Sequence, residues 1–320
     1  MAIALFCVLP QARGQGALQQ LQAMAPAGAS TGDSSVAAGQ KAGSGQDLSQ
    51  EYLAAWELAD AAFGDVQIAE LKRYKVLFVP GFFSNHYRVY FTEQMDWLRA
   101  IGVDCEKVGI NTEASVQDNA AVVARAIAAS DKPVIIVSHS KGSVDALAAL
   151  ISNSELPGKV KGWVSIQGAW LGSPIADYVS QHLILGTLAS AVLKVLGGSP
   201  ECMADLTTGA AADFIQKNKD AIQGVVHAVP LIAFASWKDA PSLWPRGLME
   251  FTGGFMYRQG IKNDGLLPSV NSLLPGADYV LAANVDHADP VMPSSAPFDR
   301  MRLTKTLLAM LLRRVGPGLK

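Results

Sequence analysis

Several features that would indicate other classes of protein are missing from this sequence. No run approaches the ~18 consecutive apolar residues that a membrane-spanning helix needs. Lysine and arginine (26 residues) nearly balance aspartate and glutamate (28) and form no basic stripe, so nothing indicates nucleic-acid binding. The three cysteines have no C-x-x-C spacing, which argues against the common zinc and redox motifs. With half of its 320 residues hydrophobic, the chain can build a large packed core.

The cysteines and the N-terminus leave the compartment open. Cys105 and Cys202 can pair if the protein is exported, with Cys7 removed or in a tail, but three cysteines suit a reducing compartment equally. Residues 3–9 are apolar but follow no lysine or arginine, so they make an incomplete signal segment. The next forty residues are rich in Ala, Gly, Gln and Ser and lack aromatics. We expect residues 1–47 to form a flexible leader, with a secreted or periplasmic location and a cytoplasmic one both open.

From residue 48 onward, strand and helix patterns alternate. Short runs rich in apolar and β-branched residues predict strands at 74–81, 103–110, 133–140, 160–168, 229–237 and 278–287. Helical periodicity predicts helices at 48–62, 90–102, 115–130, 142–153 and 298–315. Repeated strand-then-helix order predicts the α/β class, with a mostly parallel sheet covered by helices on both faces. We expect residues 48–320 to form one catalytic domain.

The segment at about residues 170–228 departs from the alternation. It is mostly helical in pattern and contains "HLILGTLASAVLKVL", which is more apolar than a surface helix normally is. One interpretation is a buried core helix. The other is a cap or lid whose apolar inner face covers a site and contacts lipid.

A polar turn interrupts the apolar strand in "PVIIVSHSKGSVDAL". The segment Ser138-His139-Ser140-Lys141-Gly142 lies between a predicted strand and a predicted helix, where a nucleophile elbow presents a serine hydroxyl above the sheet. Amides at the start of the helix can stabilise a developing oxyanion. The pattern therefore predicts Ser140 as a nucleophile.

A serine nucleophile needs a base, and the base needs an orienting acid downstream. Of the five histidines, His287 follows a predicted strand at the required place in the chain order. Asp264, in an Asn-Asp-Gly turn, is the predicted acid. Asp286 is the alternative, although it adjoins the histidine and should point to the opposite side.

Two backbone amides are candidates for an oxyanion hole. One is the amide of Lys141, directly after the nucleophile. The other follows the first strand in "VPGFFSN", where Gly81 lets the chain turn tightly and present the amide of Phe82, with Phe83 as the alternative. We expect the Lys141 side chain to be solvated and the two aromatic side chains to pack normally.

Together these motifs resemble the bacterial triacylglycerol lipases and related esterases of the α/β-hydrolase fold. "SIQGAWLGSPIADYV" is similar to the turn that leads into their lid, and "MADLTTGAAADF" to their Leu-Thr-Thr helix start. "NDGLLPSVNSLLP" resembles their acid loop and "DHADPV" their histidine motif. The resemblance spans residues 76–292 and departs from the family at Pro80, where many members have histidine, and at Ser143, where many have glycine.

The resemblance implies hydrolysis of long-chain carboxylic esters by Ser140, Asp264 and His287, with lipid or ester substrates. It also implies that Asp289 is the candidate ligand of a structural calcium. Calcium usually takes more than one carboxylate, and the expected second one is not evident between the 229–237 strand and the acid loop. We therefore expect no cofactor.

Three other functions remain open. An acyltransferase uses the same scaffold with an alcohol acceptor in place of water. An esterase for polyesters or small esters keeps the chemistry and changes the substrate. A non-catalytic α/β-hydrolase-fold binding protein would keep the fold without the reaction.

Overall fold

In a computed structural model, the chain folds around a parallel sheet. The structure describes residues 45–59, 63–184, 200–239, 248–293 and 298–315. Within these residues the sheet has six strands, all paired in parallel, in the order β2-β1-β3-β4-β5-β6. They are β1 (Lys75–Val79), β2 (Asp104–Lys107), β3 (Val134–His139), β4 (Val160–Ile166), β5 (Leu231–Trp237) and β6 (Asp278–Ala283). The predicted parallel sheet is confirmed.

The central strands are apolar on both faces because helices cover both sides of the sheet. In β1, Val76 and Phe78 pack into one core, whereas Leu77 and Val79 pack into the core on the opposite face. Alternate residues of β3 divide between the two cores in the same way. A strand buried on both sides reads as a continuous apolar run, which is why the sequence pattern located it.

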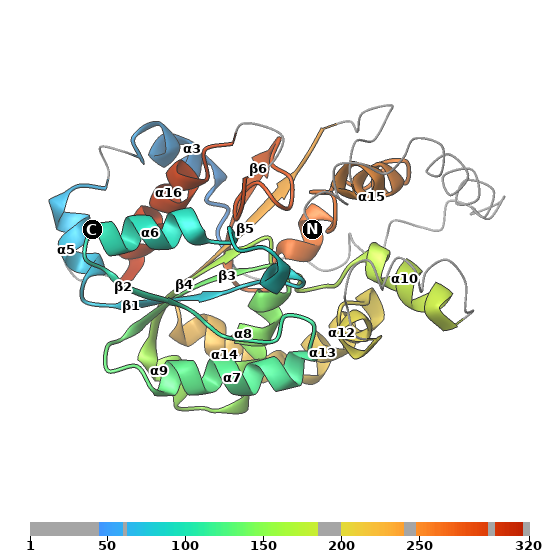
Figure 1. Cartoon of the computed structure of the whole chain (residues 1–320), viewed down its shortest axis with the longest axis horizontal. Helices are drawn as coiled ribbons and strands as arrows, with labels where there is room; N and C mark the ends of the chain where they lie inside the picture. The colour runs from blue at the N-terminus through green and yellow to red at the C-terminus, as the bar shows by residue number, and fades with distance from the viewer. Residues whose placement is uncertain (1–44, 60–62, 185–199, 240–247, 294–297, 316–320) are drawn as a thin grey trace.

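The two helical layers are visible above and below the sheet in Figure 1. The first layer consists of α3 (Ser49–Glu57), α5 (Asp65–Leu71), α6 (Thr92–Ala100) and α16 (Arg300–Val315). The second consists of α7 (Val116–Ala128), α8 (Lys141–Ser152), α9 (Leu156–Lys159) and α14 (Lys219–Ala228). Helix α7 begins with a serine cap, in which the Ser115 side chain accepts a hydrogen bond from the Asp118 amide.

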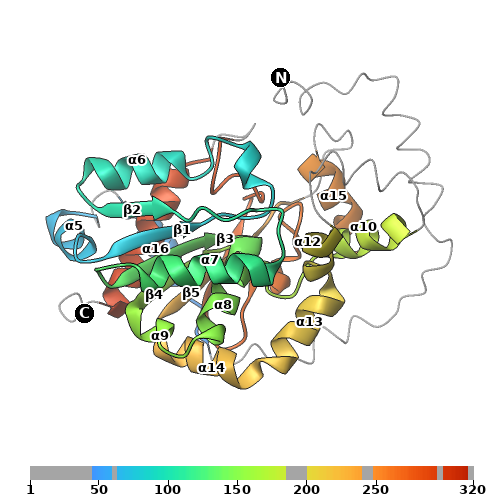
Figure 2. The same ribbon diagram turned by 60° about the horizontal axis from the view of Figure 1, so that its bottom comes forward.

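Further helices gather beyond one end of the sheet, on the right in Figures 1 and 2. They are α10 (Pro174–Ile184), α12 (Pro200–Asp205) and α15 (Leu248–Tyr257), and α13 (Thr208–Lys217) leads back toward α14. Short 3-10 turns, η2 (Ser84–His86) and η3 (Ser269–Ser272), complete the elements. The described part of the 170–228 insertion is therefore helical. Most of "HLILGTLASAVLKVL" falls in 185–199, outside the described residues.

No helix in the described ranges has the combined length and apolar character that crossing a bilayer requires.

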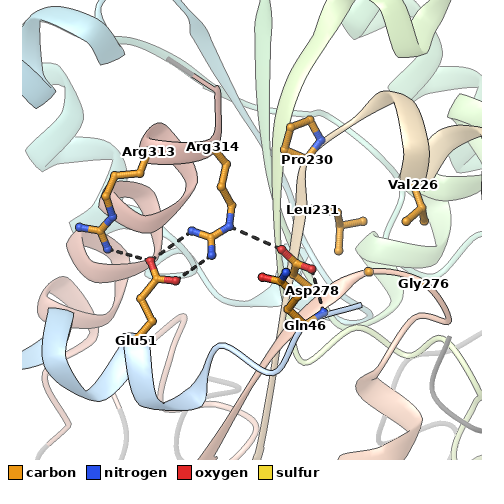
Figure 3. A pocket seen from close by; sticks show the side chains of 10 residues that line it. Gln46, Glu51, Val226, Pro230, Leu231, Gly276, Asp278, Arg313 and Arg314 are labelled. Atoms are coloured by element: carbon orange, nitrogen blue, oxygen red, sulfur yellow. Dashed lines mark hydrogen bonds and ion pairs between the residues drawn. The ribbon is translucent and has the colours of Figure 1, made fainter. Parts of the chain in front are cut away.

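The first described residues lie along the edge strand β6. Asp47 forms a parallel bridge with Tyr279, although it falls within the predicted leader; residues 1–44 lie outside the described residues. Figure 3 shows the adjoining groove of about 580 Å³, in which Glu51 pairs with Arg313 (3.1 Å) and Arg314 (2.7 Å). The groove lies at the amino ends of β5 and β6, and its charged groups are paired with one another. The groove is therefore part of the packing interface between α3, α16 and β6.

Cys105 and Cys202 are both free thiols, so the disulfide considered from the sequence is absent from the structure. The Cys202 Sγ lies 3.9 Å from the carbonyl of Thr112, and the Cys105 Sγ lies 3.6 Å from that of Met95.

Candidate active site

The strand order reverses between β1 and β3. From β1 the chain runs to β2 at one edge, then returns to β3 on the other side of β1 and continues from there to β6. At such a reversal the connections from the carboxyl ends of neighbouring strands separate and leave a crevice, where open α/β sheets bind ligands. The two segments that flank this point are the "VPGFFSN" loop after β1 and the serine turn after β3.

Ser140 occupies a strained turn between β3 and α8. Its backbone has φ 54° and ψ −129°, a region that a residue with a side chain rarely adopts. The amide of Ser140 donates to the carbonyl of Ile166 (3.1 Å), and its own carbonyl accepts from Ala169 (3.2 Å). A Cβ on Gly142 would lie 2.4 Å from the carbonyl oxygens of Val79 and Pro80, so the turn requires glycine there. This is the geometry expected of a nucleophile elbow.

Backbone strain is concentrated along the same edge of the sheet. Besides Ser140, the non-glycine residues with positive φ in the described chain include Phe83 (65°), Gln167 (47°) and Asn284 (62°). Each of these residues follows the carboxyl end of a strand within a few positions. Strain of this kind persists where surrounding contacts enforce it, as they commonly do at functional sites.

Asp264 and His287 lie in direct contact. His287 Nδ1 is 2.8 Å from Asp264 Oδ2, and the His287 amide donates to the Asp264 carbonyl, also at 2.8 Å. The other carboxylate oxygen accepts from the amides of Leu266 (3.0 Å) and Leu267 (2.8 Å). Both side chains are buried. An ionised carboxylate only accepts hydrogen bonds, so Nδ1 of His287 is the donor to Asp264, and in the neutral ring Nε2 is then the acceptor.

Asp286, the alternative acid, is engaged elsewhere. Its Oδ1 accepts from the amides of Ala288 and Asp289, both at 2.9 Å, and its Oδ2 pairs with Lys238 at 3.2 Å. Of the two candidate acids, the structure therefore brings Asp264 to the imidazole of His287.

Ser140 is connected to His287 through its neighbour in the chain. Among the described contacts, no hydrogen bond joins Ser140 Oγ to His287. Instead the ring of His139 lies 4.6 Å from the ring of His287, and His139 Nε2 is 3.0 Å from the His287 carbonyl. The structure thus places the serine turn beside the histidine loop. The catalytic assignment of Ser140 stays a prediction.

The two predicted oxyanion amides flank Ser140. A Cβ on Gly81 would lie 2.9 Å from the Cβ of Ser140, so the turn after β1 passes directly against the serine. Neither the Phe82 amide nor the Lys141 amide donates to another group in the described chain. The Phe83 ring stacks on His86 at 4.3 Å, and the Phe82 ring packs against α10 and α12.

The expectation for the Lys141 side chain is wrong. It is fully buried, and its Nζ lies 2.8 Å and 3.1 Å from the two oxygens of Asp145, one helical turn later on α8. Asp145 also accepts from Asn119 at 3.1 Å. Burial raises the pKa of Asp145, and the ion pair with Lys141 acts in the opposite direction. The i, i+4 spacing was visible in the sequence, but the burial of α8 on every side was not.

The described residues around Asp289 do not fit a calcium site. Asp289 is buried, and its Oδ2 accepts the amide of Asp286 at 2.9 Å, which holds the histidine loop. Within the described residues, no three side chains of His, Cys, Asp or Glu gather as a metal ion would require. Asp289 therefore acts on the loop conformation.

Comparison with known proteins identifies the fold. No protein-family model matches the sequence, and neither does any curated protein. The metagenomic carboxyl esterase MGS0156 superposes with a TM-score of 0.62 at 19% identity, over 75% of each chain. The mature form of the Bacillus licheniformis lipase BlEst2 superposes with a TM-score of 0.55 at 22% identity, over 68% of this chain and 85% of that one. The sheet, its strand order and these structural neighbours together show that the chain has the α/β-hydrolase fold.

Proposed function

We propose that this protein is a serine carboxylic-ester hydrolase that works through an acyl-enzyme. The observation that carries the proposal is the 2.8 Å contact between His287 Nδ1 and the buried Asp264, in a loop held next to the strained turn of Ser140. A carboxylate on Nδ1 fixes the imidazole tautomer whose Nε2 can accept a proton. A serine in such a turn exposes its hydroxyl for attack.

The proposed reaction has two halves. Ser140 Oγ attacks the ester carbonyl carbon while His287 Nε2 takes the hydroxyl proton, and the carbonyl electron pair becomes an oxyanion that the amides of Phe82 and Lys141 stabilise. Collapse of the oxyanion breaks the bond to the leaving alcohol, which receives the proton from His287. Water then attacks the acyl-enzyme with the same base, and the carboxylic acid leaves as Ser140 regains its proton. These steps need no cofactor.

We further propose a lipase-type preference for long acyl chains. The superposed structures include a carboxyl esterase and a lipase. In this chain Phe82 packs against an apolar group on α10 and α12 made by Ala176, Val179 and Met203. Apolar side chains from the insertion thus lie next to the proposed oxyanion loop, where an acyl chain or a lipid surface would meet them.

The first test is covalent labelling with a fluorophosphonate probe, followed by rates on p-nitrophenyl esters of increasing chain length. Ser140→Ala should lose labelling and hydrolysis. Ser152→Ala is the matched control, because it changes a serine at the far end of the same helix and should label like wild type. Rates that peak at long chains support the lipase type, whereas a peak at short chains supports a small-ester esterase.

Other outcomes separate the remaining functions. Products that contain an added alcohol in place of free acid indicate an acyltransferase. A folded wild-type protein that neither labels nor hydrolyses any ester overturns the proposal and favours a binding protein.

A further inference from the structure

A chain of buried polar side chains lies beneath the proposed site. Tyr90, His139 and Gln167 are 5%, 2% and 0% exposed, and they come from the loop after β1, the end of β3 and the end of β4. The mechanism above uses none of them. Their roles could not be assigned from the sequence, because nothing in their own segments shows which distant groups they face.

The hydrogen-bond partners determine the direction of the chain at His139. Its Nε2 lies 3.0 Å from the backbone carbonyl of His287, which can only accept, so Nε2 must carry a proton. The Gln167 Oε1 also faces this nitrogen at 3.1 Å. This orientation of Gln167 agrees with its other end, because Nε2 of Gln167 donates to Ser236 (2.6 Å) and to the Asp286 carbonyl (3.0 Å).

The other side of the ring then follows. Burial and the neighbouring His287 lower the pKa of His139 well below its ordinary value, so the ring is neutral and its Nδ1 is an acceptor. Nδ1 faces the hydroxyl of Tyr90, which must therefore donate to it. The Tyr90 oxygen in turn accepts the amide of Gly81 at 3.3 Å. The donor and acceptor roles are therefore fixed along the series: the Gly81 amide donates to Tyr90, Tyr90 donates to His139 Nδ1, and His139 Nε2 donates to the His287 carbonyl and Gln167 Oε1.

Each end of this series adjoins a residue of the proposed mechanism. Gly81 precedes Phe82, His139 precedes Ser140, and the final acceptor is the carbonyl of His287 itself. We propose that Tyr90, His139 and Gln167 are positioning residues that hold the oxyanion loop, the serine turn and the histidine loop in fixed positions relative to one another. This inference rests on the proposed function, since it assigns the network to the same reaction.

Loss of the network should affect the chemical step more than substrate binding. None of the three side chains belongs to the groups proposed to contact the reacting ester, and the segments they join carry the base and an oxyanion donor. A displacement of about 1 Å in such groups costs roughly 100-fold in rate. We therefore expect kcat to fall while KM stays within about twofold.

The test compares Tyr90→Phe, His139→Leu and His139→Gln in the full chain. Tyr74→Phe is the matched control, because Tyr74 is equally buried and its hydroxyl bonds Glu70 at the opposite end of β1. We expect kcat to fall about tenfold in Tyr90→Phe and about 100-fold in His139→Leu, with no change in Tyr74→Phe. His139→Gln should recover about tenfold over His139→Leu, because its amide N–H can still donate to the His287 carbonyl.

Backbone hydrogen exchange at residues 80–84 and 285–289 provides a readout that does not depend on activity. Protection of both segments should fall in Tyr90→Phe and His139→Leu relative to Tyr74→Phe. Wild-type kcat in folded Tyr90→Phe and His139→Leu, or a His139→Gln variant as impaired as His139→Leu, overturns the positioning role. If wild type itself neither labels nor hydrolyses esters, the proposed function is wrong. In that case hydrogen exchange still tests the network, and unchanged protection of both segments in the variants would contradict the positioning role.

Discussion

The hydroxyls of Ser138 and Ser143 are hydrogen-bonded to each other at 2.8 Å across the base of the serine turn. Ser138 is the penultimate residue of β3 and Ser143 lies in the first turn of α8, so the bond joins the two elements that hold Ser140. Trp163 Nε1 donates to Ser138 at 2.7 Å and Ser165 donates to Ser143 at 2.9 Å. The two serines are thus coupled to each other, and both are fully buried with their hydroxyls hydrogen-bonded.

We predict that this bond couples the stability effects of Ser138 and Ser143. Ser138→Ala leaves the buried indole N–H of Trp163 without an acceptor, which should cost about 2 kcal/mol of unfolding free energy. Ser143→Ala should cost about 1 kcal/mol. Urea unfolding of both single variants and the double variant measures the coupling. The double variant should lose less than the sum, because the shared bond is lost once; additive losses would contradict the prediction.

The buried pair of Lys141 and Asp145 gives a second stability prediction. Asp145→Leu leaves the Lys141 ammonium without a counter-ion in the core, and we expect a loss of about 3–5 kcal/mol. The double variant Lys141→Met/Asp145→Leu removes both charges and should be clearly more stable than Asp145→Leu alone. Denaturant unfolding of the two variants beside wild type checks this. A double variant that is no more stable than the single one would mean that the charges do not compensate each other.

A third prediction separates the two candidate acids. Asp264→Asn removes the carboxylate from His287 Nδ1 and favours the wrong tautomer, so kcat on a p-nitrophenyl ester should fall about 10³- to 10⁴-fold. Asp286→Asn, next to the same histidine, should lower kcat by less than about tenfold, because its carboxylate contacts Lys238 and backbone amides instead. Equal losses of kcat in the two variants would contradict the assignment of Asp264 as the acid that orients His287.

The neutral His139 predicts how stability depends on pH. The pKa of His139 in the folded state lies well below the ordinary value of 6.5. At a pH between the folded-state and the unfolded-state pKa, the unfolded chain binds a proton that the folded protein does not. Stability therefore rises with pH in this window and is lost as the pH falls below about 6.5, at up to about 1.4 kcal/mol per pH unit. The Tyr90 hydroxyl and the ring of His287 are the titratable groups that face it.

Urea unfolding of wild type and His139→Gln at pH 5.5, 6.5 and 7.5 measures this effect. The variant lacks the titrating ring, so its unfolding free energy should vary less with pH than that of wild type. Parallel curves for the two proteins would assign the acid sensitivity to other groups.

The sheet could be predicted from the sequence because its strands are buried on both faces. Each run of apolar residues, such as the one that becomes β3, can satisfy both cores only as a strand. The contact between Asp264 and His287 agrees with the sequence interpretation, because chain order and turn chemistry already favoured these residues. Short helices such as α5 and α15 were not anticipated, since their segments carry no strong period.

What the sequence pattern could not reveal depends on three-dimensional packing. Lys141 looks like a solvated charge until α8 is seen to be enclosed by α7 and α14. Gln167 lies near the end of a predicted strand, with no sign in the sequence of its partners, yet it is fully buried and contacts residues far along the chain. Single polar residues give no periodic signal, so their partners become known only when the strands are placed side by side.

The bond between Glu51 and Arg314 joins residues 263 positions apart and has a consequence for the order of folding. Closing so long a loop costs conformational entropy, and the contacts that offset this cost can form only after both α3 and α16 have been synthesised. During synthesis α3 emerges first and must wait for α16, which covers the same face of the sheet. A nascent chain stopped before residue 300 would expose that apolar face, which makes such a chain a natural client for chaperones.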